Sequence, residues 1–278
     1  METEIRKRLG SHIRLESSIL EVLAKAEQLQ LPFFQCFLVM QTGGMINVTR
    51  EEWQTFVKIA QALYGFMICH GSFWINLSSL GSNGYVQLRR EMALAKRLEF
   101  THLVLHAGTA KGATEKSQGI NALARALNNL LKREQDIMIL FENTCHGNLA
   151  IGSDILDFKQ LLEKLDIPLE RIGFCIDTAH AYSFGYDISS IDQQEDFIRL
   201  LDSTIGIERI KLIHLNDTAE RLGSCIDKHS IVGQGRIGKK ALHHFITHPQ
   251  LQTIPLLMEQ PEMPLAEEIA ILESVRGW

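Results

Sequence analysis

Prolines and long apolar runs are scarce in this sequence. Its 278 residues contain 6 prolines, and no low-complexity block or Pro/Gly/Ser-rich linker divides them. No apolar run approaches the roughly 20 residues that a membrane-crossing helix needs. The first residues carry charges instead of the apolar stretch of a signal peptide. We therefore expect one soluble domain over residues 1–278, without a membrane partner and located in the cytoplasm.

Cysteine pairs and an excess of positive charge are also missing. The 5 cysteines are widely spaced and include no Cys-x-x-Cys motif, which is typical of a reducing compartment. Lys and Arg number 28 against 33 Asp and Glu, so the formal net charge is −5. The surface as a whole therefore does not attract nucleic acid. Binding of a polyanion would require a local positive patch or bound metal ions.

What the sequence does contain is a regular alternation of strand-like and helix-like segments. Short β-rich segments, each ending in a polar residue or beside one, alternate with segments that have apolar residues at helical spacing. The predicted strands are 9–13, 33–37, 65–70, 102–106, 137–142, 173–177, 210–214 and 255–259, and predicted helices include 87–98, 120–131, 155–165, 195–205 and 239–246. Eight units of about 35 residues predict an α/β fold of the (β/α)8 TIM-barrel type. A doubly wound sheet is less favoured because no Gly-rich phosphate loop follows the first strand.

Six of the predicted strands end in residues that commonly bind metals. In a TIM barrel these ends converge on one mouth, where active sites lie. One such residue alone is more often a structural one, but three imidazoles and three carboxylates buried together without a cation would be unfavourable. The six residues predict a metal site: His70, His106, Glu142, Asp177, His214 and Glu259.

Three more ligand types, His180, Asp227 and His229, follow in the loops beyond these strands. Nine ligands exceed the needs of one tetrahedral site and predict two or three ions that share carboxylates. Imidazole with carboxylate suits zinc or manganese. The four carboxylates carry less charge than three divalent ions, so the loaded site would be positive and would attract a phosphate.

Five segments resemble motifs of the endonuclease IV family. They are His106-Ala107-Gly108, Phe141-Glu142-Asn143-Thr144 and residues 175–181, 213–217 and 223–235. The resemblance implies a zinc-dependent apurinic/apyrimidinic (AP) endonuclease of base-excision DNA repair. Such a hydrolase cleaves the phosphodiester 5′ to an abasic site in duplex DNA, and the resemblance also allows trimming of blocked 3′ ends.

The resemblance further implies three Zn²⁺ ions, of which one position could hold Mn²⁺. Glu142 would bridge the first two ions and orient the metal-bound hydroxide that attacks the phosphate, which makes it the catalytic residue. The implied ligands are His70, His106 and Glu142 for the first ion, Glu142, Asp177, His214 and Glu259 for the second, and His180, Asp227 and His229 for the third.

The segments that would touch DNA depart from the family pattern. No Arg occurs in residues 39–46, where the family carries one, and Phe73 and Trp74 replace a Tyr-Leu pair. Aromatic rings can stack on bases or wedge between them, although packing at the rim is an alternative. Lys228 replaces an Arg, which keeps the charge but loses bidentate pairing with phosphate. We predict that Phe73, Trp74 and Lys228 contact abasic duplex DNA and that the protein is a monomer.

Two other functions fit parts of this pattern. A metal-dependent sugar or sugar-phosphate isomerase or epimerase of the same barrel superfamily would use the strand-end ligands but has little need of His180, Asp227 and His229. A lesion-binding protein without cleavage would be expected to have lost at least one ligand. Close to Glu142, Cys145 is interpreted as a small residue that fills the loop, with metal binding as the alternative.

Overall fold

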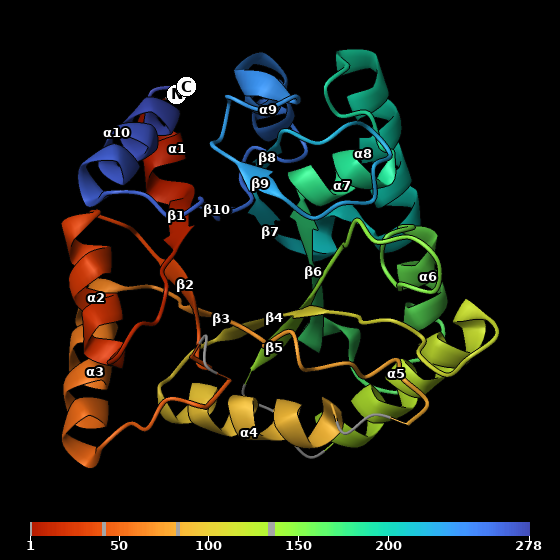
Figure 1. Ribbon diagram of the computed structural model, residues 1–278, viewed down its shortest axis with the longest axis horizontal. Helices are drawn as coiled ribbons and strands as arrows, with labels where there is room; N and C mark the ends of the chain where they lie inside the picture. Colours follow the sequence, from red (N-terminus) through yellow and green to blue (C-terminus); the bar gives the residue numbers. More distant parts are fainter. Residues whose placement is uncertain (1, 41–42, 82–83, 133–136) are drawn as a thin grey trace.

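Eight parallel strands close into a barrel at the centre of the molecule, and helices surround it (Figure 1). The computed structural model describes residues 2–40, 43–81, 84–132 and 137–278. The order around the barrel is β1-β10-β7-β6-β5-β4-β3-β2. The strands are β1 (Leu9–His12), β2 (Phe34–Phe37), β3 (Ile68–His70), β4 (His102–His106), β5 (Met138–Glu142), β6 (Ile172–Asp177), β7 (Ile210–His214) and β10 (Leu256–Met258). The predicted TIM barrel is confirmed.

A layer of apolar side chains fills the barrel below its mouth. It consists of Phe33, Ile68, Val104, Leu140, Cys175, Leu212 and Leu257. Side chains alternate along a strand, so a residue two positions further on points into the same interior. Those positions are Gln35, His70, His106, Glu142, Asp177, His214 and Glu259. The alternation of side chains along the strands thus places a layer of polar residues at the mouth, directly above the layer of apolar residues.

The ring of helices covers the outside of the barrel, and the two chain ends lie side by side (Figure 1). Ser18 with Glu21 and Thr49 with Glu52 form capping boxes that fix the starts of α2 and α3. The helices are α1 (Glu2–Arg8), α2 (Ile19–Gln28), α3 (Arg50–Leu63), α4 (Gly84–Arg97), α5 (Lys116–Leu131), α6 (Leu156–Leu162), α7 (Thr178–Phe184), α8 (Ile191–Ile205), α9 (Gly238–Thr247) and α10 (Leu265–Arg276), with 3-10 turns η1 (Leu169–Arg171) and η2 (Ile207–Arg209). Among the described residues, no helix has both the length and the apolar character needed to cross a membrane.

Two elements at the mouth were not predicted. Helix α7 begins directly after β6, because Asp177 caps it by accepting a hydrogen bond from the backbone N–H of His180. Strands β8 (Asp217–Thr218) and β9 (His229–Ser230) form a separate antiparallel ribbon. Both are too short to show a hydrophobic period. They carry His180 and His229, which the sequence had placed in loops.

Candidate metal centre

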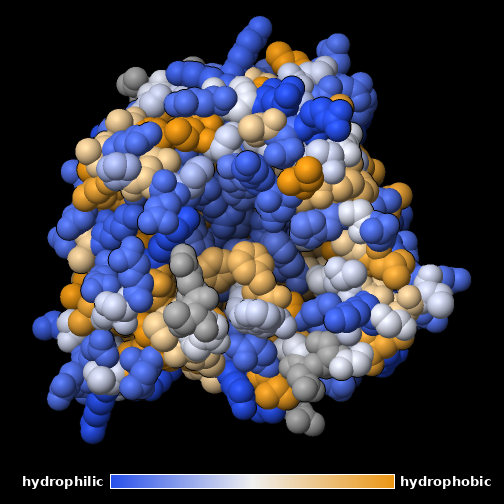
Figure 2. Space-filling view, viewed as in Figure 1, coloured by the Kyte–Doolittle hydropathy of each residue, from blue (hydrophilic) through white to orange (hydrophobic). Residues whose placement is uncertain are grey.

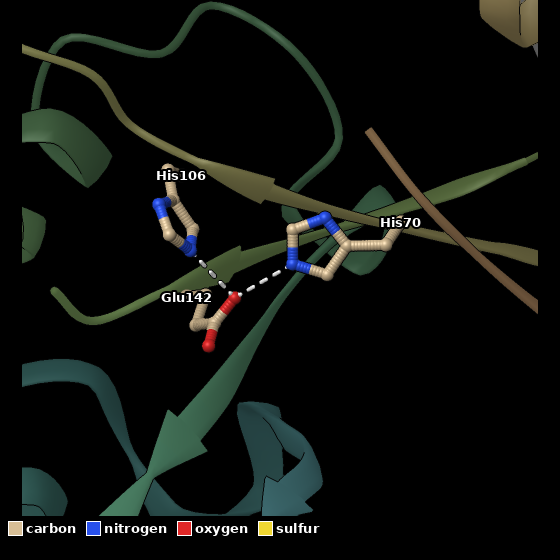
Figure 3. Close-up of side chains that lie close together, drawn as sticks. All are labelled: His70, His106 and Glu142. Atoms are coloured by element: carbon tan, nitrogen blue, oxygen red, sulfur yellow. Dashed lines mark hydrogen bonds and ion pairs between the residues drawn. The ribbon is translucent and has the colours of Figure 1, made fainter. Parts of the chain in front are cut away.

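The mouth of the barrel is hollow and hydrophilic. Figure 2 shows a depression in the middle of this face, over the barrel of Figure 1, with hydrophilic residues along most of its walls and hydrophobic residues at its lower edge. At its base, the Nε2 atoms of His70 and His106 each lie 3.0 Å from Oε2 of Glu142. Figure 3 shows both imidazoles converging on this one oxygen. Neighbouring strands position the three side chains, with His106 directly opposite Glu142 in the register of β4 and β5.

A second group of potential ligands meets the other oxygen of Glu142. His214 Nδ1 lies 2.9 Å from Glu142 Oε1, 3.4 Å from Glu259 Oε2 and 3.9 Å from Asp177 Oδ2. One ligand atom from each of these four residues lies within 4.8 Å of the others. Glu142 therefore belongs to both groups, and one oxygen faces each.

A third group lies beside the second. His229 Nε2 is 3.6 Å from Asp177 Oδ2 and 3.6 Å from Asp227 Oδ1, and His180 Nε2 is 3.1 Å from Asp227 Oδ1. Asp177, His180 and His229 also place ligand atoms within 4.8 Å of one another. All nine residues that the sequence predicted thus converge at the mouth, and Asp177 is shared by the second and third groups.

In three of the imidazoles, one ring nitrogen is held by a hydrogen bond. This bond sets the direction in which the other ring nitrogen points. Nδ1 of His70 lies 2.8 Å from the carbonyl oxygen of Gly71, and Nδ1 of His180 lies 2.9 Å from that of Asn143. His214 presents Nε2 to Gln35 Oε1 at 3.0 Å. Each of these nitrogens donates, so in the neutral imidazole that binds a metal ion the other nitrogen of each ring would be the acceptor.

Polar residues behind the ligands were missed by the sequence analysis. Gln35 Nε2 donates to Glu259 Oε1 at 2.8 Å, and Asn216 Nδ2 donates to Asp177 Oδ2 at 2.6 Å and to Glu259 Oε2 at 3.1 Å. A signal was present for both. Gln35 is the polar residue within the apolar strand β2, and Asn216 lies inside one of the motif segments.

The contacts of Glu142, His180 and Asp227 shift the pKa values of these side chains. Burial disfavours the charged form of Glu142, yet His214 and His106 hold its pKa well below the usual range. Burial likewise opposes a charged His180, but Asp177 and its neighbours raise the pKa of this imidazole well above its usual value. For Asp227, burial is outweighed by His180, and its pKa falls to about 2. The carboxylates of Glu142 and Asp227 are therefore ionised at neutral pH.

The residues present fit divalent cations. Nε2 of His180 and Nε2 of His229 are buried and make no hydrogen bond, although Asp227 Oδ1 lies 3.1 Å from the first and 3.6 Å from the second. Buried ring nitrogens without a partner are rare in a folded protein. Oriented imidazoles, ionised carboxylates and hydrogen-bonded supports behind them are the donor set that zinc or manganese takes.

Two aromatic side chains stand at the rim of the depression. Phe73 and Trp74 are 74% and 70% exposed. The centroid of the Phe73 ring lies 5.5 Å from that of Phe37 and 6.1 Å from that of His106. Phe73 therefore packs beside a predicted metal ligand while most of its side chain stays exposed. Glu91 is fully buried in α4 and accepts the backbone N–H of Ser72 at 2.9 Å, which holds this loop.

Lys228 lies in the segment between β8 and β9. Lys228 is exposed, and its carbonyl oxygen accepts a hydrogen bond from Thr218 Oγ1. In the loop of residues 39–46, which lacks the Arg of the family, residues 41–42 are outside the described part of the chain. The sequence-predicted contacts with DNA thus lie on exposed loops around the buried centre.

One buried carboxylate holds the segment that carries Asp227 and His229. Asp217 accepts the backbone N–H groups of Thr218, Gly233, Gly235, Ile237 and Gly238 at 2.8–3.2 Å. A Cβ on Gly235 would lie only 2.3 Å from Asp217 Oδ1, so glycine is needed for this close approach. Asp217 was not among the predicted site residues, although it ends a motif segment.

Comparison with known proteins agrees with this geometry. The family model described as xylose isomerase-like TIM barrel matches residues 23–276. A protein of Thermosipho melanesiensis named "Probable endonuclease 4" is 36% identical over 263 residues, which cover 91% of this chain and 92% of that protein. The chain belongs to the endonuclease IV family. The resemblance found in the sequence is thereby confirmed.

Solved structures share the fold of this endonuclease IV family member. Endonuclease IV from Thermus thermophilus superposes with a TM-score of 0.83 at 24% identity and covers 96% of this chain and 98% of its own. A D-tagatose 3-epimerase-like protein superposes with a TM-score of 0.73 at 15% identity, covering 96% of each chain. At these identities the likeness is one of fold. The barrel alone therefore does not separate a nuclease from an epimerase.

Proposed function

We propose that this endonuclease IV family member is a metal-dependent AP endonuclease that hydrolyses the phosphodiester 5′ to abasic sites in duplex DNA. The observation that carries the proposal is the sharing of Glu142 between two ligand groups, with a third group beside them. A sugar isomerase or epimerase would need only the strand-end residues. The ligands His180, Asp227 and His229 favour the nuclease.

The proposed cofactors are three Zn²⁺ ions, with Mn²⁺ as an alternative at one position. His70, His106 and Glu142 would hold the first, Glu142, Asp177, His214 and Glu259 the second, and His180, Asp227 and His229 the third. When bound, such ions lower the pKa of a coordinated water and neutralise negative charge on a phosphate.

The chain's own residues have two tasks in this mechanism. Glu142 stays ionised and, through its two oxygens, fixes the positions of the first two groups relative to each other. Asn216 and Gln35 keep the carboxylate of Glu259 in a single orientation. No side chain forms a covalent bond to the substrate, so the reaction is direct hydrolysis.

Recognition of the lesion would fall to the rim. Phe73 and Trp74 offer exposed rings on which a base can stack or which can enter the gap left by a missing base. Lys228 supplies a positive charge for a backbone phosphate. We further propose a monomeric enzyme of base-excision repair that acts in the cytoplasm, with trimming of blocked 3′ ends as a second activity.

Cleavage of a defined duplex tests the proposal. The substrate carries one tetrahydrofuran analogue of an abasic site, and the zinc and manganese contents of the same protein sample are measured. We expect incision 5′ to the analogue, loss of incision after chelation and recovery when metal is restored. No incision by a preparation that holds about three ions per chain would overturn the proposal and favour a sugar-phosphate substrate.

A further inference from the structure

A fourth group of ligand-type side chains lies beside the three already described. Cys145, His146 and Asp227 each place one ligand atom within 4.8 Å of the other two. Sγ of Cys145 is 3.9 Å from Nδ1 of His146. Asp227 is also in contact with His180 and His229, whereas Cys145 and His146 belong to none of the other groups. We propose that these three residues form an additional site for a thiophilic divalent cation such as Zn²⁺.

The loop that presents the thiol and the imidazole is held in place from behind. The hydroxyl of Ser153 donates to the carbonyl oxygen of His146 at 2.6 Å. The backbone N–H of Thr144 donates to the carbonyl oxygen of Gly152, whose own N–H is accepted by Asp157 at 3.0 Å. A backbone fixed on both sides keeps the ligand atoms close without a large loss of conformational entropy on binding.

The donor set is softer than that of the other groups. A thiolate beside an imidazole selects zinc over manganese, while carboxylates and imidazoles alone do not. Binding would transfer the proton of the Cys145 thiol to solvent, and the sulfur would then form the bond to the cation. With one oxygen of Asp227, the protein supplies three ligands and leaves the remaining position of a tetrahedral ion to water.

An ion can reach this site from solvent. His146 is exposed, and it lines a cavity of about 240 Å³ that His106 also lines. The thiol of Cys145 is buried on the inner side of the same loop. The site is therefore open on the imidazole side and closed on the sulfur side.

Asp227 links this site to the third group. Its Oδ1 lies 3.1 Å from His180 Nε2, so the same carboxylate faces the third group and the thiol. A shared carboxylate joins two neighbouring positions, as Glu142 does for the first two groups. The nine ligands of the first three groups would hold one set of ions. The chain is therefore expected to bind one zinc ion in addition to that set.

Cobalt substitution tests the sulfur ligand directly. In Co²⁺-loaded wild-type protein we expect a thiolate-to-cobalt charge-transfer band in the near ultraviolet. The band should vanish in Cys145→Ser and remain in Cys225→Ser, a matched control. The Cys225 sulfur lies 3.7 Å from the place where a Cβ on Gly147 would be, close to the loop but outside the group. Absence of the band in wild-type protein, or its loss only in Cys225→Ser, would overturn the proposal.

Zinc binding provides a second measurement that does not depend on a buried substitution. His146→Gln changes an exposed side chain, so the fold is expected to persist and can be checked by circular dichroism. Titration against a chromophoric chelator should show the weakest-bound zinc ion losing affinity by about tenfold or more. Equal zinc content and affinity in the variant and the wild type would contradict the site.

These outcomes are independent of the proposed nuclease. Protein that incises abasic DNA but lacks the cobalt band would refute the additional site alone. Protein that shows the band but incises no abasic DNA would refute the proposed function alone.

Discussion

The strand-borne and loop-borne parts of the centre differ in how their side chains are held. Glu142, at the end of β5, has a side chain that is 1% exposed, and Asp227, in the segment between β8 and β9, has one that is 32% exposed. The first is fixed by the register of the barrel. The second depends on a segment that Asp217 holds by backbone hydrogen bonds. Buried ligands fixed by the barrel and partly exposed ligands carried by a loop thus come from different parts of the chain.

This contrast agrees with what the sequence analysis expects of each part. There the strand-end residues lie in or beside segments that resemble the family motifs, while Phe73, Trp74 and Lys228 are interpreted as departures from them. Barrel positions are constrained by the apolar layer two residues below them. Phe73, Trp74 and Lys228 are exposed, so substitution there is expected to cost little stability. The comparison can be tested by changing each part separately.

The largest effect is expected from Glu142→Gln. The variant keeps the shape of the side chain but removes the charge shared by two ligand groups. Turnover on abasic duplex DNA should fall by about two orders of magnitude or more, because metal-held charge contributes several kcal/mol to such reactions. Single-turnover incision by metal-replete protein measures this. Glu262→Gln, an exposed Glu paired with Arg14, is the control. Unchanged turnover would contradict the assignment.

Gln35→Leu tests the support behind the strand-borne ligands. The change leaves His214 Nε2 without its partner and leaves Glu259 Oε1 with His12 Nδ1 at 3.5 Å. Metal affinity should fall by roughly 10–100-fold, the usual effect of removing a residue that orients ligands. Chelator competition measures it, with Gln61→Leu, an exposed glutamine on α3, as the control. If affinity is retained, the barrel alone is sufficient to orient the ligands.

The double variant Phe73→Ala and Trp74→Ala tests the rim. Its affinity for abasic duplex DNA should fall by about 1–3 kcal/mol for each lost stacking contact, while its zinc content should not change. Fluorescence anisotropy and metal analysis of the same samples give both values. Leu63→Ala removes an exposed apolar side chain on α3 and serves as the control. Wild-type binding by the double variant would indicate that the aromatic residues only pack at the rim.

The smallest effect is expected from Lys228→Ala. One phosphate contact fewer should lower the slope of log affinity against log salt by about 1, with little change in the preference for abasic over intact DNA. Binding measured over a series of salt concentrations gives the slope. Lys132→Ala, at the C-cap of α5 and paired with Asp166, should leave it unchanged. An equal change in both variants would mean that Lys228 has no specific contact.

The sequence was sufficient for the barrel and for the ligand ring because both follow from periodicity. Strand spacing set the fold, and alternation within each strand set which residues point inward. It could not reveal the roles of Gln35, Asn216 and Asp217, which make tertiary hydrogen bonds between segments far apart in the chain. Nor did it reveal α7 or the β8–β9 ribbon, because elements of a few residues show no period.

Asp217 has a consequence for protein engineering. The Asp217 carboxylate accepts hydrogen bonds from backbone N–H groups within residues 233–238. The residues between Asp217 and Gly233 therefore form a loop whose two ends are held together. A loop closed in this way can be exchanged as a unit, because its ends do not move when its interior changes. Segments from other members of the family could be transplanted between Asp217 and Gly238, which would alter the proposed ligands Asp227 and His229 and leave the barrel below unchanged.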